Sequence, residues 1–294
     1  MARPRDVVPP AWSVLTRTTH RIWTHPENRG RRLRRLGRWA AWQAAERVVR
    51  RPWTIDFHGG LRLICRPHDT VTTLALYCGL YDAEEMRFLL AWLRDGDTFV
   101  DVGANVAPYS LLATLVPGVR AVAFEPATVA RQRAQANVEL NGVGDRVTLV
   151  ARAVGDVDGP ARLSADRWAT NALVGADHTG PVEEVACTRL DTFDAETGLG
   201  KVSLLKVDVE GHELAVLDGA ACLLARDRPA LVVELNDVAG LRAFAAIHGY
   251  VPVRYAPASQ AVTRRDWPET PGGNVVLVPD VRAAQRRVAH GPPP

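Results

Sequence analysis

The chain has 294 residues, of which 47% are hydrophobic and 23% are charged. This is the composition of a globular protein, and the length fits one α/β core with additions. No run approaches the roughly 18 uninterrupted apolar residues of a membrane-spanning helix, so we expect a soluble or peripheral protein.

The net charge of +3 is unevenly distributed. Residues 1–51 contain 13 arginines against three acidic residues, a local net charge of +10, which leaves −7 for the rest of the chain. Twin arginines occur at 31–32 and 34–35, but the apolar run after them is too short for an export signal. The four cysteines form no Cys-x-x-Cys pair, and their apolar neighbours favour buried thiols in a reduced compartment. We therefore expect a cytoplasmic protein.

The basic arm, residues 1–51, is predicted to be extended or partly disordered over 1–30, where four prolines interrupt a weakly periodic sequence. From residue 31 to about 50, Leu33, Leu36, Trp39 and Ala40 recur at helical spacing among arginines, which predicts a basic amphipathic helix. We favour packing of its apolar stripe on its own domain or on a second copy of the chain. Contact of residues 31–51 with an anionic membrane is the next interpretation, and nucleic acid the third.

Residues 52–96 lead into the core. Residues 54–57 and 61–65 flank a turn containing two glycines, which predicts a β-hairpin. Asp82, followed three residues later by Glu85, predicts a capping box at the start of a helix that continues towards the first core strand.

Residues 97–280 alternate strand-like and helix-like segments, which predicts an α/β fold with a mostly parallel sheet and helices on both faces. Residues 155–197 form a looser insertion between two core strands, and we expect it beside the crevice at the carboxyl ends of the strands. Residues 281–294 are assigned as a tail. Strands are expected at 98–102, 119–124, 147–153, 202–207, 230–235, 250–255 and 275–278.

A glycine turn at the end of the first core strand predicts a nucleotide-type site. Gly103 allows close approach of the backbone to a ligand, and Glu125 ends the next strand 125 − 103 = 22 residues later. An interval of about 20 residues is typical of a carboxylate that binds ribose hydroxyls. Asn105 and Pro108 stand where the dinucleotide fingerprint needs glycines, so a cofactor with a ribose but no phosphates, S-adenosylmethionine, fits better.

A second polar group follows the strand at 202–207. Lys206, Asp208 and Glu210 alternate along the chain, so they point to one side while the chain stays extended. Ionisable groups at a buried strand end are costly unless they are paired or used in function. A Lys206–Asp208 ion pair that caps the sheet is the structural alternative.

Taken together, these motifs resemble the FkbM family of S-adenosylmethionine-dependent methyltransferases. The resemblance covers about residues 80–235 and 273–277 and implies a class I, Rossmann-like methyltransferase fold, in which the last of seven strands is antiparallel. It also implies methylation of a hydroxyl oxygen, often on a sugar or natural product. Ala107 stands where the family usually has glycine, and we expect only a tighter loop there. The matching segments are 101–105, Glu125-Pro126, Asn137 with Asn141-Gly142, 206–213 and Val233-Glu234.

The resemblance and the reaction imply roles for the cofactor site. Asp101 and Gly103 would line the methionine and ribose side, Asn105 would orient the loop or the carboxylate, and Glu125 would accept both ribose hydroxyls. Ala153, after the third strand, is expected to form a wall for adenine.

Catalytic roles fall on the second polar group. Asp208 is the candidate general base or orienter of the acceptor hydroxyl, with Lys206 and Glu210 tuning it. His212 is the alternative base because imidazole titrates near neutral pH. Asp208 and Glu210 could instead bind Mg²⁺, but two carboxylates are thin support, so we assign no metal site.

Two other functions remain open at this point. A nicotinamide-dependent oxidoreductase on a Rossmann sheet would use the same topology, and a non-catalytic ligand-binding protein could dock through its basic arm. The acceptor, whether a small molecule or a glycan, is not identified by any motif.

Overall fold

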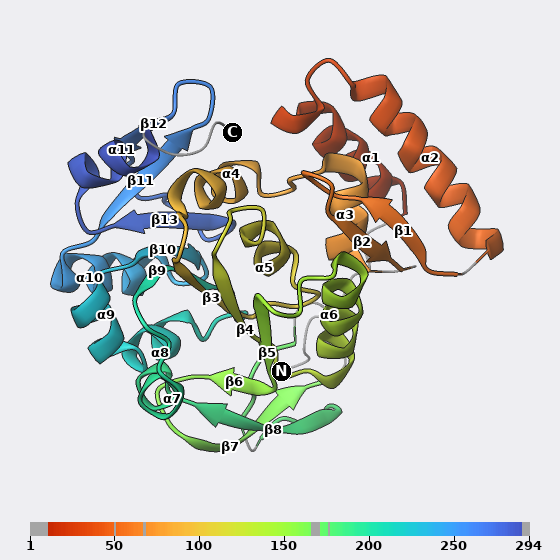
Figure 1. Cartoon of the computed structure of the whole chain (residues 1–294). Coiled ribbons are helices and arrows are strands. Elements are labelled where there is room, and N and C mark those ends of the chain that lie inside the picture. The colour runs from red at the N-terminus through yellow and green to blue at the C-terminus, as the bar shows by residue number, and fades with distance from the viewer. Residues whose placement is uncertain (1–10, 50, 67–68, 166–170, 176, 290–294) are drawn as a thin grey trace, which may run out of the picture.

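The computed structural model describes residues 11–49, 51–66, 69–165, 171–175 and 177–289. A twisted eight-stranded sheet lies at the centre with helices on both faces (Figure 1). The strand order is β12-β11-β13-β10-β9-β3-β4-β5. In chain order these are β3 (Thr98–Val102), β4 (Arg120–Phe124), β5 (Val147–Val150), β9 (Val202–Val207), β10 (Ala230–Glu234), β11 (Val251–Ala256), β12 (Ala261–Arg264) and β13 (Asn274–Val278).

The sheet confirms the predicted class I methyltransferase fold. β3, β4, β5, β9 and β10 pair in parallel, whereas β13 is antiparallel to both of its neighbours, β10 and β11. With β11, these strands lie at the seven expected places in the chain, although β5 ends at Val150, before the expected end at residue 153. β12 adds an eighth by pairing antiparallel with β11, and its four residues form only a short edge strand.

The apolar residues of the strands divide between two cores by their period-two alternation. Phe99 packs in one cluster with α4 (Ala83–Trp92), α5 (Pro108–Ala113), α6 (Thr128–Asn141) and α11 (Val281–Ala289). Val100, the next residue, packs in the other with α7 (Leu190–Thr197), α8 (Glu213–Asp218), α9 (Ala221–Asp227) and α10 (Val238–His248). Each face of the sheet is therefore covered by helices, as expected for a mostly parallel sheet.

The N-terminal arm is more regular than predicted. Residues 11–24, expected to be extended, form α1 (Ala11–Thr24), which is followed by η1 (Pro26–Asn28) and α2 (Arg32–Val49). Ile22 is 1% exposed, and the buried Asn28 amide donates to the carbonyls of Ile22 and Tyr77, so tertiary contacts hold a helix that the sequence pattern did not show. Residues 1–10 and 290–294, also assigned to the arm and tail, lie outside the described residues.

The apolar stripe of α2 packs on the body of the protein. Trp42 is 4% exposed, and Leu36 and Trp39 contact the same core cluster. Packing on its own domain, the favoured interpretation of this helix, is confirmed for these three side chains. The stripe meets α3 (Thr70–Cys78) beside the predicted hairpin, β1 (Trp53–Asp56) and β2 (Arg62–Cys65).

The insertion forms a second, three-stranded sheet of β6 (Arg152–Val154), β8 (Val182–Thr188) and β7 (Gly159–Ser164). The single strand expected at 147–153 is therefore wrong. β5 ends at Val150, and after Ala151 the chain leaves the main sheet to pair with β8. Among the described residues, no helix combines the length and hydrophobicity needed to cross a membrane.

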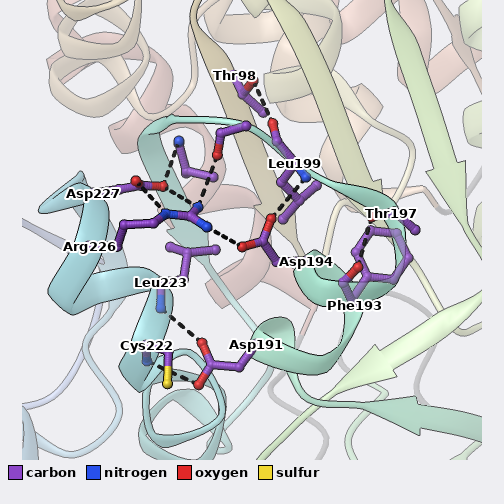
Figure 2. A network of polar contacts seen from close by, with 12 residues as sticks. Thr98, Asp191, Phe193, Asp194, Thr197, Leu199, Cys222, Leu223, Arg226 and Asp227 are labelled. Atoms are coloured by element: carbon purple, nitrogen blue, oxygen red, sulfur yellow. Dashed lines mark hydrogen bonds and ion pairs between the residues drawn. The ribbon is translucent and has the colours of Figure 1, made fainter.

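A polar network fixes the amino-terminal ends of β3 and β9 (Figure 2). The Asp227 carboxylate accepts the backbone N–H of Val202 at 2.9 Å, and Arg226 bridges Asp227 to Asp194 at 2.7 and 2.5 Å. Asp191 accepts two N–H groups in the first turn of α9. These contacts hold the sheet from the edge opposite the carboxyl ends of its strands, where ligands bind in such folds.

Candidate functional site

A pocket of about 330 Å³ lies at the carboxyl ends of β3, β4, β9 and β10. Eight of the nine residues predicted for the site line it: Gly103, Asn105, Glu125, Ala153, Lys206, Asp208, Glu210 and His212. Leu163, Asn171 and Leu173 of the insertion also line it, which confirms that the insertion lies beside this crevice.

Gly103 allows two loops of the protein to approach each other closely. Its φ is +79°, and a Cβ at this position would lie 1.8 Å from the backbone carbonyl oxygen of Asp208. The close approach is therefore between the two loops that follow β3 and β9, and the absence of a side chain lets them meet. Gly103 also donates its N–H to the carbonyl of Phe124 at 3.0 Å, which ties its turn to β4.

Glu125 is held in one orientation by two backbone donors. The N–H of Asn105 lies 2.8 Å from its Oε2, and the N–H of Ala127 lies 2.9 Å from its Oε1. Asn105 thus orients the carboxylate through its backbone. Burial raises the pKa of Glu125 to about 7, against the opposing effect of these two hydrogen bonds.

Strained backbone gathers at the pocket. Asn105, Ala107 and Glu210 are three of the five non-glycine residues with positive φ in the described part of the chain. Such conformations cost about 1–3 kcal/mol each and persist where the surroundings enforce them. Ala107 has φ 64° and is buried, which explains physically why glycine suits this position and why alanine still fits.

Lys206 links two carboxylates beneath the pocket floor. Its Nζ lies 2.9 Å from Asp208 Oδ2 and 3.9 Å from Asp101 Oδ1. Burial opposes the charged lysine, but the nearby Asp208 and Asp101 outweigh it and raise the pKa of Lys206. The ion pair given as the structural alternative is therefore present, and it also orients the Asp208 carboxylate at the pocket.

Asp101, which was expected on the methionine and ribose side of the site, does not line the pocket in this structure. Asp101 is 1% exposed and lies behind the wall, where Oδ2 accepts the Ser110 hydroxyl at 2.6 Å. Asp101 pairs in register with Lys206 of β9, so the two side chains lie next to each other on the same face of the sheet. Its contacts make it a positioning residue for the lysine.

The other wall contains two residues that the sequence did not reveal, Tyr81 and Asp82. Asp82 precedes α4 but makes no capping hydrogen bond, so the predicted capping box is wrong; Asp82 instead accepts the Tyr109 hydroxyl at 2.9 Å. Tyr81 is held from behind by His25, whose Nε2–H donates to the Tyr81 carbonyl at 3.0 Å. The arm therefore supports one wall of the pocket.

Asp208, Glu210 and Glu234 bring carboxylate oxygens within 4.8 Å of one another. Burial, with Asp208 and Glu210 adding repulsion, raises the pKa of Glu234 to about 8. Burial and Asp208 also raise the pKa of Glu210. Glu234 therefore carries a proton at neutral pH, which relieves the repulsion. Such oxygens could also hold a divalent cation, but the cluster alone gives no reason to assign one.

These shifts predict that stability falls as pH rises. In the folded protein the pKa of Glu85 and of Glu125 is about 7 and that of Glu234 is about 8, whereas the unperturbed value is 4.5. At pH values between 4.5 and these raised values, the folded state therefore binds more protons than the unfolded state. The buried His25 and the partly buried His58 have lowered pKa values, so the unfolded state binds more protons at these two histidines near pH 6.5, which partly opposes the effect of the three carboxyl groups. We expect the melting temperature to fall from pH 6.5 to 8 in a thermal-shift assay.

Glu234→Gln should flatten the upper part of this pH profile because glutamine cannot ionise but keeps nearly the volume of the glutamate side chain. Glu184→Gln, at an exposed residue of β8, is the control and should keep the slope. A melting temperature that rises between pH 7 and 8 would contradict the assignment.

Comparison with known proteins finds similarity to methyltransferases of the FkbM type. A family model described as the methyltransferase FkbM domain matches residues 101–252. The 31-O-demethyl-FK506 methyltransferase FkbM of Streptomyces tacrolimicus is 32% identical over 183 residues, which are 50% of this chain and 68% of that protein. Methyltransferase 1 of Beauveria bassiana (strain ARSEF 2860) is 30% identical over 147 residues, covering 42% of this chain and 59% of the relative.

A solved structure, the methyltransferase FkbM from Methylobacillus flagellatus KT, is 19% identical with a TM-score of 0.45. That match covers 71% of this chain and 52% of the solved one, so this chain spans about half of its length. The segment matched by the family model is more than half of the chain and holds the glycine turn, Glu125 and the carboxylates after β9. The chain therefore belongs to the FkbM methyltransferase family.

Proposed function

We propose that this protein is an S-adenosylmethionine-dependent O-methyltransferase that acts on a hydroxyl of a sugar, glycan or natural product. The observation that carries the proposal is the Glu125 carboxylate, fixed by two backbone N–H groups at the pocket beside the glycine turn. Membership of the family supports it and speaks against the nicotinamide alternative.

The pocket residues fit this cofactor. Each Glu125 oxygen accepts one backbone N–H, which leaves lone pairs on both for the two ribose hydroxyls. Ala153, with Val154 beside it on β6, offers an apolar wall for adenine. The carboxylate of Asp208 lies in the same pocket and favours a cationic sulfonium.

The cofactor supplies a methyl group on a cationic sulfur, and this charge makes the methyl carbon electrophilic towards the acceptor oxygen. The protein must align the acceptor hydroxyl and remove its proton. Asp208 is half-buried, lines the pocket and is oriented by Lys206 at 2.9 Å, so its free oxygen is available as hydrogen-bond acceptor and base. The Asp208 carboxylate would take up the hydroxyl proton as the methyl group passes from the sulfonium sulfur to the acceptor oxygen.

The charge of the acceptor half limits the substrate. Asp82, Asp208 and Glu210 line the part of the pocket around Lys206, and Glu234, which carries a proton at neutral pH, lies beside them. An acceptor with a phosphate or carboxylate beside its hydroxyl would meet like charge in a partly buried pocket. A neutral polyhydroxylated acceptor meets hydrogen-bond acceptors instead, which is why we favour sugars and hydroxylated natural products.

Glu125→Ala should weaken S-adenosylmethionine binding by about a hundredfold, measured by isothermal titration calorimetry. Two hydrogen bonds to a charged acceptor contribute about 1.5 kcal/mol or more each. Because Glu125 titrates at about 7 in the free protein and binds hydroxyls best when ionised, the wild-type affinity should fall as pH drops below 7.

The control is Glu85→Gln. Glu85 also titrates at about 7 but lies outside the pocket, so this variant should keep both the affinity and its pH dependence. Glu125→Gln should lose the pH dependence. An affinity of Glu125→Ala equal to that of the wild type would overturn the proposed cofactor site.

A further inference from the structure

Two large apolar side chains are exposed where the end of α1 meets the start of α2. Trp23 is 45% exposed and Leu33 is 78% exposed. The Arg32 guanidinium lies 5.2 Å from the Trp23 ring centre, so the two helix ends are adjacent. We call residues 21–34 the docking tip; Figure 1 shows its two helices at the edge of the molecule.

Leu33 continues an apolar stripe past the body of the protein. Leu36 and Trp39, three and six residues later on α2, pack against the core, whereas Leu33 extends beyond it. The exposed Trp23 and Leu33 therefore form an apolar surface, at one end of an otherwise packed stripe, that no described residue covers.

The docking tip is also strongly positive. Arg21, Arg29, Arg31 and Arg34 are exposed. Glu27, the one acidic residue in the sequence between 16 and 45, is bound to Arg87 at 2.5 Å. Since residues 52–294 carry a net charge of −7, the positive potential is concentrated on the arm.

We propose that the docking tip binds the surface of an anionic lipid bilayer. Tryptophan concentrates at the headgroup level of bilayers, and leucine enters the boundary of the acyl chains. The surrounding arginines are attracted to anionic headgroups. This surface differs from the one expected from the sequence, because most of the α2 stripe is packed and the exposed part lies at the turn with α1.

Other occupants satisfy fewer of these features. A polynucleotide would engage the arginines but would gain little from Leu33. A second copy of the tip would bring two sets of exposed arginines together, which like-charge repulsion opposes. The lipid surface uses the apolar and the basic side chains at once. Binding of the docking tip to a bilayer does not require the methyl transfer reaction.

The test is co-sedimentation of the full chain with vesicles of phosphatidylcholine, with and without phosphatidylglycerol. We expect binding only to the vesicles with phosphatidylglycerol, and weaker binding as salt is added. The triple variant Arg29→Gln, Arg31→Gln, Arg34→Gln should lower partitioning by about a hundredfold, at about fivefold for each arginine. Leu33→Ser should lower it by about tenfold.

Matched changes elsewhere are the controls. Ile247→Ser alters an apolar residue that is also 78% exposed, and Arg242→Gln, Arg264→Gln, Arg282→Gln removes three exposed arginines far from the tip in sequence. Both should bind vesicles like the wild type. Equal loss in tip and control variants, absence of wild-type binding, or RNA binding that needs the tip arginines but not Leu33 would each overturn the proposal.

Discussion

Replacing Gly103 with alanine is expected to abolish cofactor binding and to destabilise the fold by about 3 kcal/mol or more. Alanine at φ +79° costs about 1–2 kcal/mol, and its Cβ would stand 1.8 Å from a backbone oxygen of Asp208. Because the clash is with a backbone atom, a change of side-chain rotamer cannot relieve it, and overpacking adds about 1–3 kcal/mol to the loss of stability. Urea unfolding measures the loss of stability, and calorimetric titration with S-adenosylmethionine measures the loss of cofactor binding.

Gly142→Ala is the matched control. Gly142 has φ +63° at the end of α6, but a Cβ there would meet no atom within 4 Å. This variant should lose only the cost of the left-handed conformation and should bind cofactor normally. If both variants lose the same stability and Gly103→Ala still binds cofactor, the contact between the two loops does not organise the pocket.

Asp208→Asn is expected to lower kcat by at least about a hundredfold while leaving cofactor affinity within about threefold. The amide keeps the shape of the side chain but cannot accept the hydroxyl proton, and general-base catalysis contributes about 10²–10⁴-fold. Steady-state assays with a radiolabelled methyl donor and a reactive hydroxylated acceptor give kcat. Calorimetry gives the affinity of each variant for the cofactor.

His212→Gln separates this role from its rival. His212 lines the same pocket, and its Nδ1 is buried without a hydrogen-bond partner among the described residues. If Asp208 is the base, His212→Gln should retain most of kcat. A hundredfold loss in His212→Gln together with a mild effect of Asp208→Asn would transfer the role to the imidazole.

The sequence predicted the centre of the fold well because the strands are buried on both faces. β3 and β9 are mostly apolar, with Asp101 and Lys206 one residue before their carboxyl ends, and parallel strands place those ends along one edge of the sheet. The interval from Gly103 to Glu125 was informative for the same reason: β4 lies beside β3, so 22 residues of chain return to the same edge.

The other side of the pocket could not be predicted because its residues depend on long-range packing. α3 is rich in threonine and apolar residues, a composition that resembles a strand, and the Asp69 cap on Thr72 together with burial makes it helical. Tyr81 and Asp82 follow it, and the Asp82 contact with Tyr109 spans 27 positions. No local motif records such a pairing.

Asp101 illustrates a different limit. Its position at the end of β3 was correct, but alternation along a strand does not reveal which side of the glycine turn the pocket occupies. The register of β3 against β9 sets Asp101 opposite Lys206, and this register is a property of the assembled sheet.

The bond from His25 to the Tyr81 carbonyl bears on how the enzyme is studied in fragments. A version trimmed to start at the hairpin would keep every residue that lines the pocket, yet it would leave the Tyr81 carbonyl without its donor. We expect the affinity of such a fragment for acceptors to differ from that of the intact chain, even where the two bind the cofactor equally.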